Sequence, residues 1–198
     1  MKLECLKKNV KKISAFFMLA VLISMSTPEP AQAYDFNDGY ITNTITFIPS
    51  TAFGAESIAA FNNALYPWNY QSGRTLMLRA ANQSHGSLIY PYNDGKSYIY
   101  KVYAGDQYVA YCQRFPTSGP VGSADININP AYPWANSQQV DCFDVWSVFA
   151  HESGHAAGLA HSSYVDATMY KFASRNSIEW RTLHEDDIEG IQYLYLYL

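Results

Sequence analysis

The sequence predicts one α+β domain in which helices pack on a short sheet, as in an α/β sandwich. Segments with alternating apolar and polar residues, typical of half-buried strands, recur through the first two thirds of the chain. Two later segments place apolar residues at helical spacing. No internal repeat or low-complexity linker divides these elements, so we expect a single domain with a short sheet.

The first 33 residues have the layout of a secretory signal peptide. Five lysines precede an apolar run from Ile13 to Ile23, and the small-residue site Ala31-Gln32-Ala33 follows. A membrane anchor is the alternative, but it requires about 20 apolar residues, roughly twice this run. We therefore expect a signal peptide over 1–33, a single domain over 34–198, and a secreted, extracellular protein without a stable membrane anchor.

Charge excludes one class of partner. The signal peptide holds five of the 13 basic and two of the 17 acidic residues, so residues 34–198 carry eight basic and 15 acidic residues, a net charge of −7. A nucleic-acid-binding surface is normally basic. We expect a monomer that does not bind nucleic acid.

Five strands and one helix are predicted in the first part of the domain. The strands are predicted at 41–48, 75–80, 97–103, 108–115 and 124–129. Apolar residues at 58, 61, 65 and 68 predict a helix after the first strand, and Pro67 should close it. Proline-rich breaks follow three of the strands, at Pro49, 116–122 and Pro130.

Two helices are predicted in the last third. Asp141 can cap a helix over 142–157, which Gly158 should end. A long loop then runs to about residue 181. Thr182 and Glu185 form a possible capping box for a last helix. Its apolar face is Ile188, Ile191, Leu194 and Leu198.

The stretch from His151 to His161 contains the residues of a catalytic zinc site. His151 and His155 lie four residues apart on the predicted helix, so both imidazoles face the same side. Gly158 permits a sharp turn that returns His161 as a third ligand. Three protein ligands leave a fourth position for water, and Glu152 is placed to take a proton from it.

This pattern is specific. A random chain of this length would show the five residues at this spacing with a frequency on the order of 10⁻⁴. The alternative is a helix with solvated surface histidines. The pattern is that of the metzincin metalloproteases.

Flanking residues resemble one branch of the metzincins, the matrixins, which are the matrix-metalloproteinase-like enzymes. Ser162 follows the third histidine as in matrixins, where other branches have Glu, Asp or Pro. Residues 167–170, Ala-Thr-Met-Tyr, are similar to the matrixin Met-turn, and 186–195 to the C-terminal helix. Lys171 stands where astacins and serralysins have a metal-binding Tyr.

The resemblance implies a metzincin catalytic domain with a short twisted mixed sheet, an active-site helix, a Met-turn and a C-terminal helix. It implies a zinc endopeptidase with one Zn²⁺ and Met169 as a hydrophobic floor under the metal. A protein or peptide substrate would pair with an exposed edge strand, by chain order 108–114, although that strand could instead be a covered inner one. The substrate-binding candidates are Tyr108, Ala110, Tyr170 and Lys171.

The chain also departs from the family pattern. We expect no folded prodomain, no cysteine switch and no hemopexin-like extension. The loop that holds a second zinc in animal matrixins is missing, and His85 is predicted to be a surface residue. Asp94, Asp106 and Asp125 offer oxygen ligands for Ca²⁺, but no loop has a calcium-binding spacing.

Two cysteines remain after removal of the signal peptide. An even pair in an oxidising compartment predicts a disulfide between Cys112 and Cys142, with two buried free thiols as the alternative. Two other functions stay open at this point. One is a secreted binding or adhesion module that keeps the fold without turnover, and the other is a zinc hydrolase of a non-protein bond.

Overall fold

The computed structural model describes residues 39–86 and 93–197. The predicted signal peptide lies outside this part of the chain. In chain order the elements are β1 (Ile45–Pro49), α1 (Ala55–Gln71), β2 (Met77–Arg79), β3 (Ser97–Tyr100), β4 (Ala110–Phe115), β5 (Ser123–Ile128), β6 (Trp134–Ala135), β7 (Phe143–Asp144), α2 (Val145–Ala157), the 3₁₀ turn η1 (Glu179–Arg181), α3 (Glu185–Gln192) and its π-helical end η2 (Tyr193–Tyr197). The predicted α+β class is confirmed.

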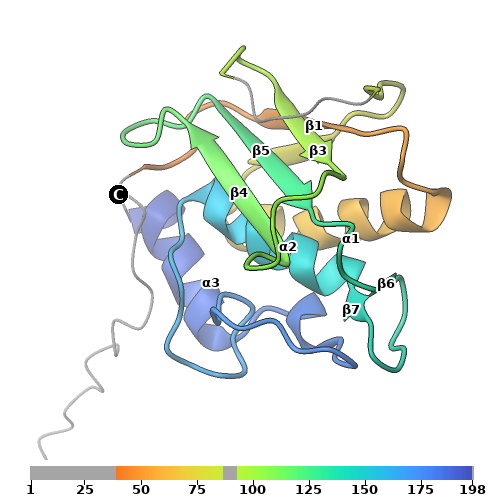
Figure 1. The fold of residues 1–198 in the computed structure, drawn as a ribbon. Helices are drawn as coiled ribbons and strands as arrows, with labels where there is room; N and C mark the ends of the chain where they lie inside the picture. The colour runs from red at the N-terminus through yellow and green to blue at the C-terminus, as the bar shows by residue number, and fades with distance from the viewer. Residues whose placement is uncertain (1–38, 87–92, 198) are drawn as a thin grey trace, which may run out of the picture. The chain divides into compact units, whose positions relative to one another are not determined.

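The main sheet is mixed and has five strands in the order β2-β1-β3-β5-β4 (Figure 1). All pairs are parallel except β4 with β5, which run antiparallel with Ala110 opposite Ile128 and Phe115 opposite Ser123. All five strands were predicted from the sequence, with ends that differ by a few residues. Strand β4 lies at one end of the sheet, which confirms its prediction as an edge strand.

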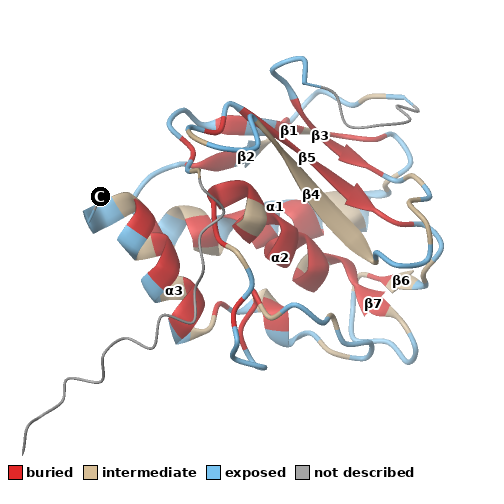
Figure 2. Cartoon of the chain, turned by 60° about the vertical axis from the view of Figure 1, so that its left-hand side comes forward, coloured by how far each residue is buried: buried red, intermediate tan, exposed pale blue. Residues whose placement is uncertain are grey.

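Helices α1 and α2 lie side by side against one face of this sheet (Figure 1). Fully buried aromatic rings fill the contacts among these elements. The ring centroids of Phe61 in α1 and Phe149 in α2 are 4.5 Å apart, and those of Phe47 in β1 and Phe149 are 5.9 Å apart. Figure 2 shows that α2 is buried along most of its length. The helix that carries the histidine motif is therefore a rigid core element rather than a surface helix.

Helix α1 continues one turn past Pro67, which was predicted to end it. Proline removes one helical hydrogen bond and disfavours the helix. Tertiary contacts hold the last turn. The Trp68 indole donates to the Ala150 carbonyl at 2.9 Å, and the Asn69 side chain donates to the Met77 carbonyl at 2.7 Å.

The caps of α2 and α3 also differ from the prediction. Asp144, not Asp141, caps α2, and its carboxylate accepts from the Ser147 N–H at 2.8 Å. Asp141 instead adopts a left-handed conformation with φ 59° in the preceding turn. The capping box of α3 is formed by His184 and Asp187 rather than by Thr182 and Glu185.

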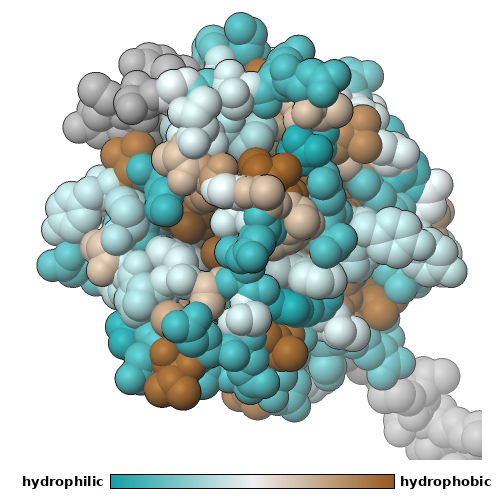
Figure 3. All heavy atoms as spheres, turned by 90° about the vertical axis from the view of Figure 1, so that its right-hand side faces the viewer, coloured by the Kyte–Doolittle hydropathy of each residue, from teal (hydrophilic) through white to brown (hydrophobic). Residues whose placement is uncertain are grey.

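Strands β6 and β7 form a separate parallel pair before α2 and were not predicted, because each has only two residues. Among the described residues no helix is long and apolar enough to cross a membrane. On the face shown in Figure 3, apolar side chains form small separate patches among hydrophilic ones.

Candidate metal centre

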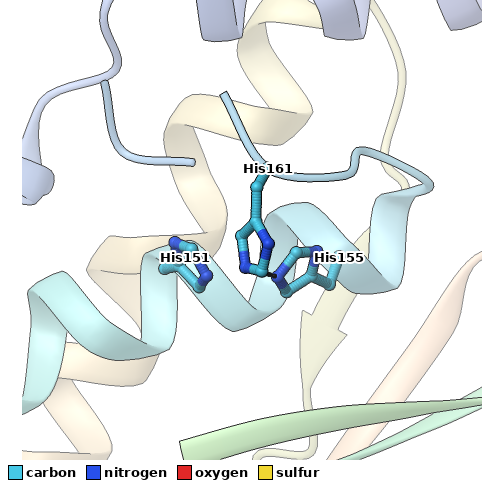
Figure 4. A group of neighbouring side chains, drawn as sticks. All are labelled: His151, His155 and His161. Carbon is cyan, nitrogen blue, oxygen red and sulfur yellow. Dashed lines mark hydrogen bonds between the residues drawn. The ribbon is translucent and has the colours of Figure 1, made fainter. Parts of the chain in front are cut away.

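Helix α2 presents His151 and His155 on one face, four residues apart, as predicted. Gly158 then ends the helix with φ 112°, a left-handed conformation that favours glycine. A Cβ at Gly158 would also lie 2.3 Å from the Gly39 carbonyl oxygen. This turn brings His161 back over the helix, where its ring points toward the other two (Figure 4).

The three histidines converge. Their ligand atoms all lie within 4.8 Å of one another, and the Nε2 atoms of His155 and His161 are 3.2 Å apart. Tetrahedral zinc with bonds of 2.0–2.1 Å would hold two ligand nitrogens about 3.3 Å apart. The donor set and its spacing therefore fit a zinc ion.

Backbone carbonyls orient two of the three rings. The Nδ1 atom of His151 donates to the Thr168 carbonyl at 2.7 Å, and that of His155 donates to the Leu159 carbonyl at 2.8 Å. Each bond fixes the tautomer in which Nε2 carries the free lone pair that a metal needs.

The triad is held in its neutral form. Burial lowers the pKa of His151 well below its ordinary value, and the neighbouring His155 adds to this effect. Burial also lowers the pKa of His155 to about 4. Burial, followed by the charge of Lys171, lowers the pKa of His161. Neutral imidazole is the form that binds a metal, so protons compete weakly for these nitrogens at pH 7.

Glu152 lies in the same cleft, with 6% of its surface exposed. Burial raises the pKa of Glu152 to about 8 in the metal-free protein. A bound dication would favour the carboxylate form and lower this value. The group is thus placed in the range where a carboxylate exchanges protons near neutral pH.

Met169 lies under α2 and is 2% exposed. Its turn is held by Asp187 of α3, whose carboxylate accepts from the backbone N–H groups of Thr168 at 2.8 Å and Met169 at 3.0 Å. The close approach of Met169 to the helix depends on Gly154. A Cβ there would lie 2.2 Å from the Met169 sulfur and 2.9 Å from the Trp68 ring.

Gly154→Ala should therefore destabilise the protein, because the added methyl group overpacks the contact with Met169. We expect a loss of about 1–3 kcal/mol in the free energy of unfolding, which for a domain of this size lowers the Tm by roughly 2–12 °C. Gly54→Ala is the control, since a Cβ at Gly54 meets nothing within 4 Å. Differential scanning calorimetry of the metal-free proteins measures both; equal Tm values for the two variants would contradict the tight contact.

Two residues near the triad were missed by the sequence analysis. The Trp180 ring stacks on His151, with centroids 4.9 Å apart and an interplanar angle of 17°. Arg181 forms an ion pair with Asp144, the cap of α2. Both lie in η1, inside a segment with no periodicity that reads only as a loop, so the sequence carried no signal for either role.

The triad opens into a cleft of about 560 Å³. Three of the four substrate-binding candidates, Tyr108, Ala110 and Lys171, line it. Tyr170 does not line this cleft but an adjoining cavity of about 130 Å³. The two spaces share the lining residues Val148, Phe172, Ala173 and Trp180.

The predicted disulfide between Cys112 and Cys142 is wrong, because both cysteines are free. Cys112 lines the cleft beside Glu152, whereas Cys142 precedes the start of α2. Helical residues 145–152 alone span about 10 Å. A disulfide requires Cα atoms within about 7 Å, so the two thiols face different ends of the helix.

The other candidate ligands lie outside the triad. His85, predicted to be a surface residue, is partly buried, and its ring nitrogens lie 2.6 and 3.0 Å from the carbonyl oxygens of Gly86 and Ile99. Asp125, considered for Ca²⁺, is fully buried and accepts from the Tyr98 N–H and the Tyr100 hydroxyl. Asp94 and Asp106 likewise bond to tyrosine hydroxyls, those of Tyr98 and Tyr103. These contacts give no support for a calcium site.

Comparison with known proteins places this geometry in a family. A family model described as Matrixin matches residues 35–196, nearly the whole described domain. The chain belongs to the matrixin family. The resemblance inferred from His151–His161 and the Met-turn is thereby confirmed, and membership implies a zinc-dependent protease.

Individual matrixin relatives match shorter stretches. Human matrix metalloproteinase-20 is 31% identical over 120 residues, which is 61% of this chain and 22% of that protein. Human matrix metalloproteinase-15 is 37% identical over 78 residues, covering 39% of this chain and 12% of the relative. Dog matrix metalloproteinase-9 is 51% identical over 53 residues, covering 27% of this chain and 7% of the relative. The chain thus spans less than a quarter of the length of these relatives.

Proposed function

We propose that this matrixin is a secreted zinc-dependent endopeptidase that hydrolyses peptide bonds without a covalent intermediate. The observation that carries the proposal is the convergence of three neutral imidazoles beside a buried carboxylate, in a cleft bordered by the edge strand β4. His151, His155 and His161 would hold the zinc. When bound, zinc lowers the pKa of its water to about 7 and polarises the scissile carbonyl.

Glu152 is the proposed general base. Its carboxylate accepts a proton from the attacking water and returns it to the nitrogen of the leaving amine. Burial of Glu152 raises its pKa toward neutrality, which favours this exchange. Trp180, stacked on His151, and the buried Met169 pack against the metal-binding helix and would hold the His151 ring in place.

The substrate would lie extended along β4 and add a strand to the sheet. The Val109 and Phe115 carbonyls face β5, because they accept from the N–H groups of Asn129 and Gly122. Backbone groups of alternate residues point to opposite sides of an antiparallel strand. The N–H and C=O groups of Ala110 and Cys112 therefore face the open edge, beside Glu152 and available for a peptide.

Secretion, domain limits and oligomeric state belong to the same proposal. Residues 1–33 would act as a signal peptide, and 34–198 would form one catalytic domain. We propose a monomer, in keeping with the scattered small apolar patches of Figure 3. Substrates are proteins or peptides, and the net charge of −7 after removal of the signal peptide disfavours nucleic acid.

A specificity for large apolar residues directly after the scissile bond is expected. The cavity beside the triad is lined in part by Val148, Phe172 and Ala173, and burying a Leu or Phe side chain there is worth about 1.5–3 kcal/mol. Leu should therefore be preferred over Ala by roughly 10–150-fold in kcat/KM. A peptide series varied only at this position measures the preference.

Lys171 could instead give the site a preference for acidic side chains, and its substitution tests this alternative. Its ammonium lines the cleft, 4.7 Å from the Phe172 ring centroid, and would attract an acidic substrate side chain. The wall of the smaller cavity also contains the buried Ser147 hydroxyl, which has no hydrogen-bond partner and could bind a polar substrate side chain. A flat profile, or one favouring Asp and Glu that disappears in Lys171→Ala, would contradict the apolar preference.

The proposal is tested by incubating the purified protein with a proteome-derived peptide library, with and without a chelator. Mass spectrometry of the products should find cleavage sites that vanish with chelation. Stable binding of peptides with no new termini would instead indicate a binding module that keeps the fold without turnover.

A further inference from the structure

The polar face of β5 is buried, although its alternating sequence is typical of a strand with one solvated face. Asp125, Asn127 and Asn129 are 0%, 1% and 0% exposed. Buried polar side chains in proteins are normally hydrogen-bonded. Here their partners lie in β3 and in the segment 101–109 that leads from β3 to β4.

The three side chains bind β3 and then this segment in order along the chain. Asp125 accepts from Tyr98 and Tyr100 in β3. Asn127 then pairs with both backbone groups of Val102, accepting from its N–H at 3.0 Å and donating to its C=O at 2.8 Å. The Asn127 amide thus continues the β3–β5 ladder after Tyr100, where the backbone pairing of the two strands ends.

Asn129 holds the part of the segment nearest the cleft. Its amide nitrogen donates to the carbonyls of Gly105 and Tyr108, both at 2.7 Å. Its backbone N–H donates to the Val109 carbonyl at 3.0 Å, and its side-chain oxygen accepts from the Ala131 N–H at 3.1 Å. One buried side chain therefore fixes the backbone immediately before β4.

That backbone borders the candidate active site. Residues 107–112 line the cleft that contains the histidine triad and Glu152. The bond to Tyr108 and the bond to Val109 set the direction in which Ala110, the first residue of β4, presents its backbone groups at the open edge. A displaced segment would move the groups that a substrate strand must meet, while the triad on α2 stays in place.

We propose that Asn129 is a positioning residue for the substrate, which holds residues 105–110 so that the start of β4 pairs with an extended peptide. This inference rests on the proposed endopeptidase function. Asn129 does not touch the reacting atoms, so its effect should fall on peptide binding rather than on chemistry at the metal.

Asn129→Asp tests the proposal, because a carboxylate has nearly the same shape but cannot donate to the two carbonyls. Loss of a donor to buried carbonyls should raise the KM for an extended peptide by about tenfold and change kcat by less than about threefold. The inhibition constant of acetohydroxamic acid, a small chelator of the metal, should stay the same, since it does not need β4.

Asn127→Asp is the matched control. It makes the same change at an equally buried position two residues earlier, in β5, but its lost bond is to Val102, which does not line the cleft. We expect a similar decrease in Tm and a KM within about twofold of the parent. Equal increases of KM in both variants, or an unchanged KM in Asn129→Asp, would overturn the proposal.

Tyr132→Phe keeps the test decisive if Asn129→Asp does not fold. The exposed hydrogen bond from the Tyr132 hydroxyl to the Asp106 carbonyl restrains the same segment from outside. Its removal should raise the KM by about two- to threefold without a change in kcat, and an unchanged KM would refute positioning by this segment. The unsubstituted protein distinguishes failure of the positioning proposal from failure of the proposed function. If the unsubstituted protein cleaves no peptide, the endopeptidase function itself is contradicted.

Discussion

Glu152→Gln is expected to reduce kcat/KM for peptide hydrolysis by at least about 10²–10⁴-fold, the range typical for loss of a general base. The amide has almost the same size as the carboxylate but cannot accept the proton of the attacking water. No ligand of the triad is changed, so the variant should keep about one zinc per chain. Elemental analysis and a fluorogenic peptide assay measure the two properties on the same sample.

Glu189→Gln provides the matched control, because Glu189 is an exposed carboxylate in α3 that lines neither the cleft nor the cavity beside it. It should hydrolyse the peptide at close to the parent rate. If Glu152→Gln retained the parent rate, proton transfer would have to be assigned to another group. If Glu152→Gln lost both zinc and activity, the loss of activity would be due to weaker metal binding and not to loss of the base.

His161→Ala is expected to abolish zinc binding at micromolar metal, and with it the activity. Two of three ligands remain, which is too few for a catalytic zinc site. His161 is exposed and makes no backbone contact like those of His151 and His155, so its removal should leave the packing of the metal-free fold intact. At a free zinc concentration of 100 times its Kd, zinc binding should raise the free energy of unfolding of the parent by about 2.7 kcal/mol. The variant should show no such increase.

His85→Ala removes an imidazole outside the triad and should retain the zinc-dependent increase in Tm. Calorimetry with and without added zinc makes the comparison. A variant His161→Ala that still bound one zinc with the parent affinity would exclude His161 as a ligand.

The candidate metal centre could be predicted because its residues lie close together in the sequence. Helical geometry alone places His151 and His155 on one face, and a glycine turn returns His161 within three residues. The edge position of β4 also followed from the matrixin resemblance. In each case a local pattern or a family pattern determined the arrangement.

Features that depend on the packing of distant segments could not be predicted. A disulfide between Cys112 and Cys142 was predicted because two cysteines remain in a protein expected in an oxidising compartment. In the fold the length of α2 separates the two thiols. Pro67 reads as a helix end, yet contacts of Trp68 and Asn69 with other elements extend α1 beyond it. Asn129 directly follows β5, a strand whose alternation suggests a solvated face, and only the fold shows that a connecting segment covers this face.

The central claim is that hydrolysis depends on one zinc held by the three histidines, and stoichiometric reconstitution tests it most directly. Metal-free protein is titrated with zinc while peptide hydrolysis and bound zinc are measured together. We predict no hydrolysis without metal and a linear increase that ends at one zinc per chain. Hydrolysis that is complete before zinc is added, or that is unaffected by its removal, would contradict the account.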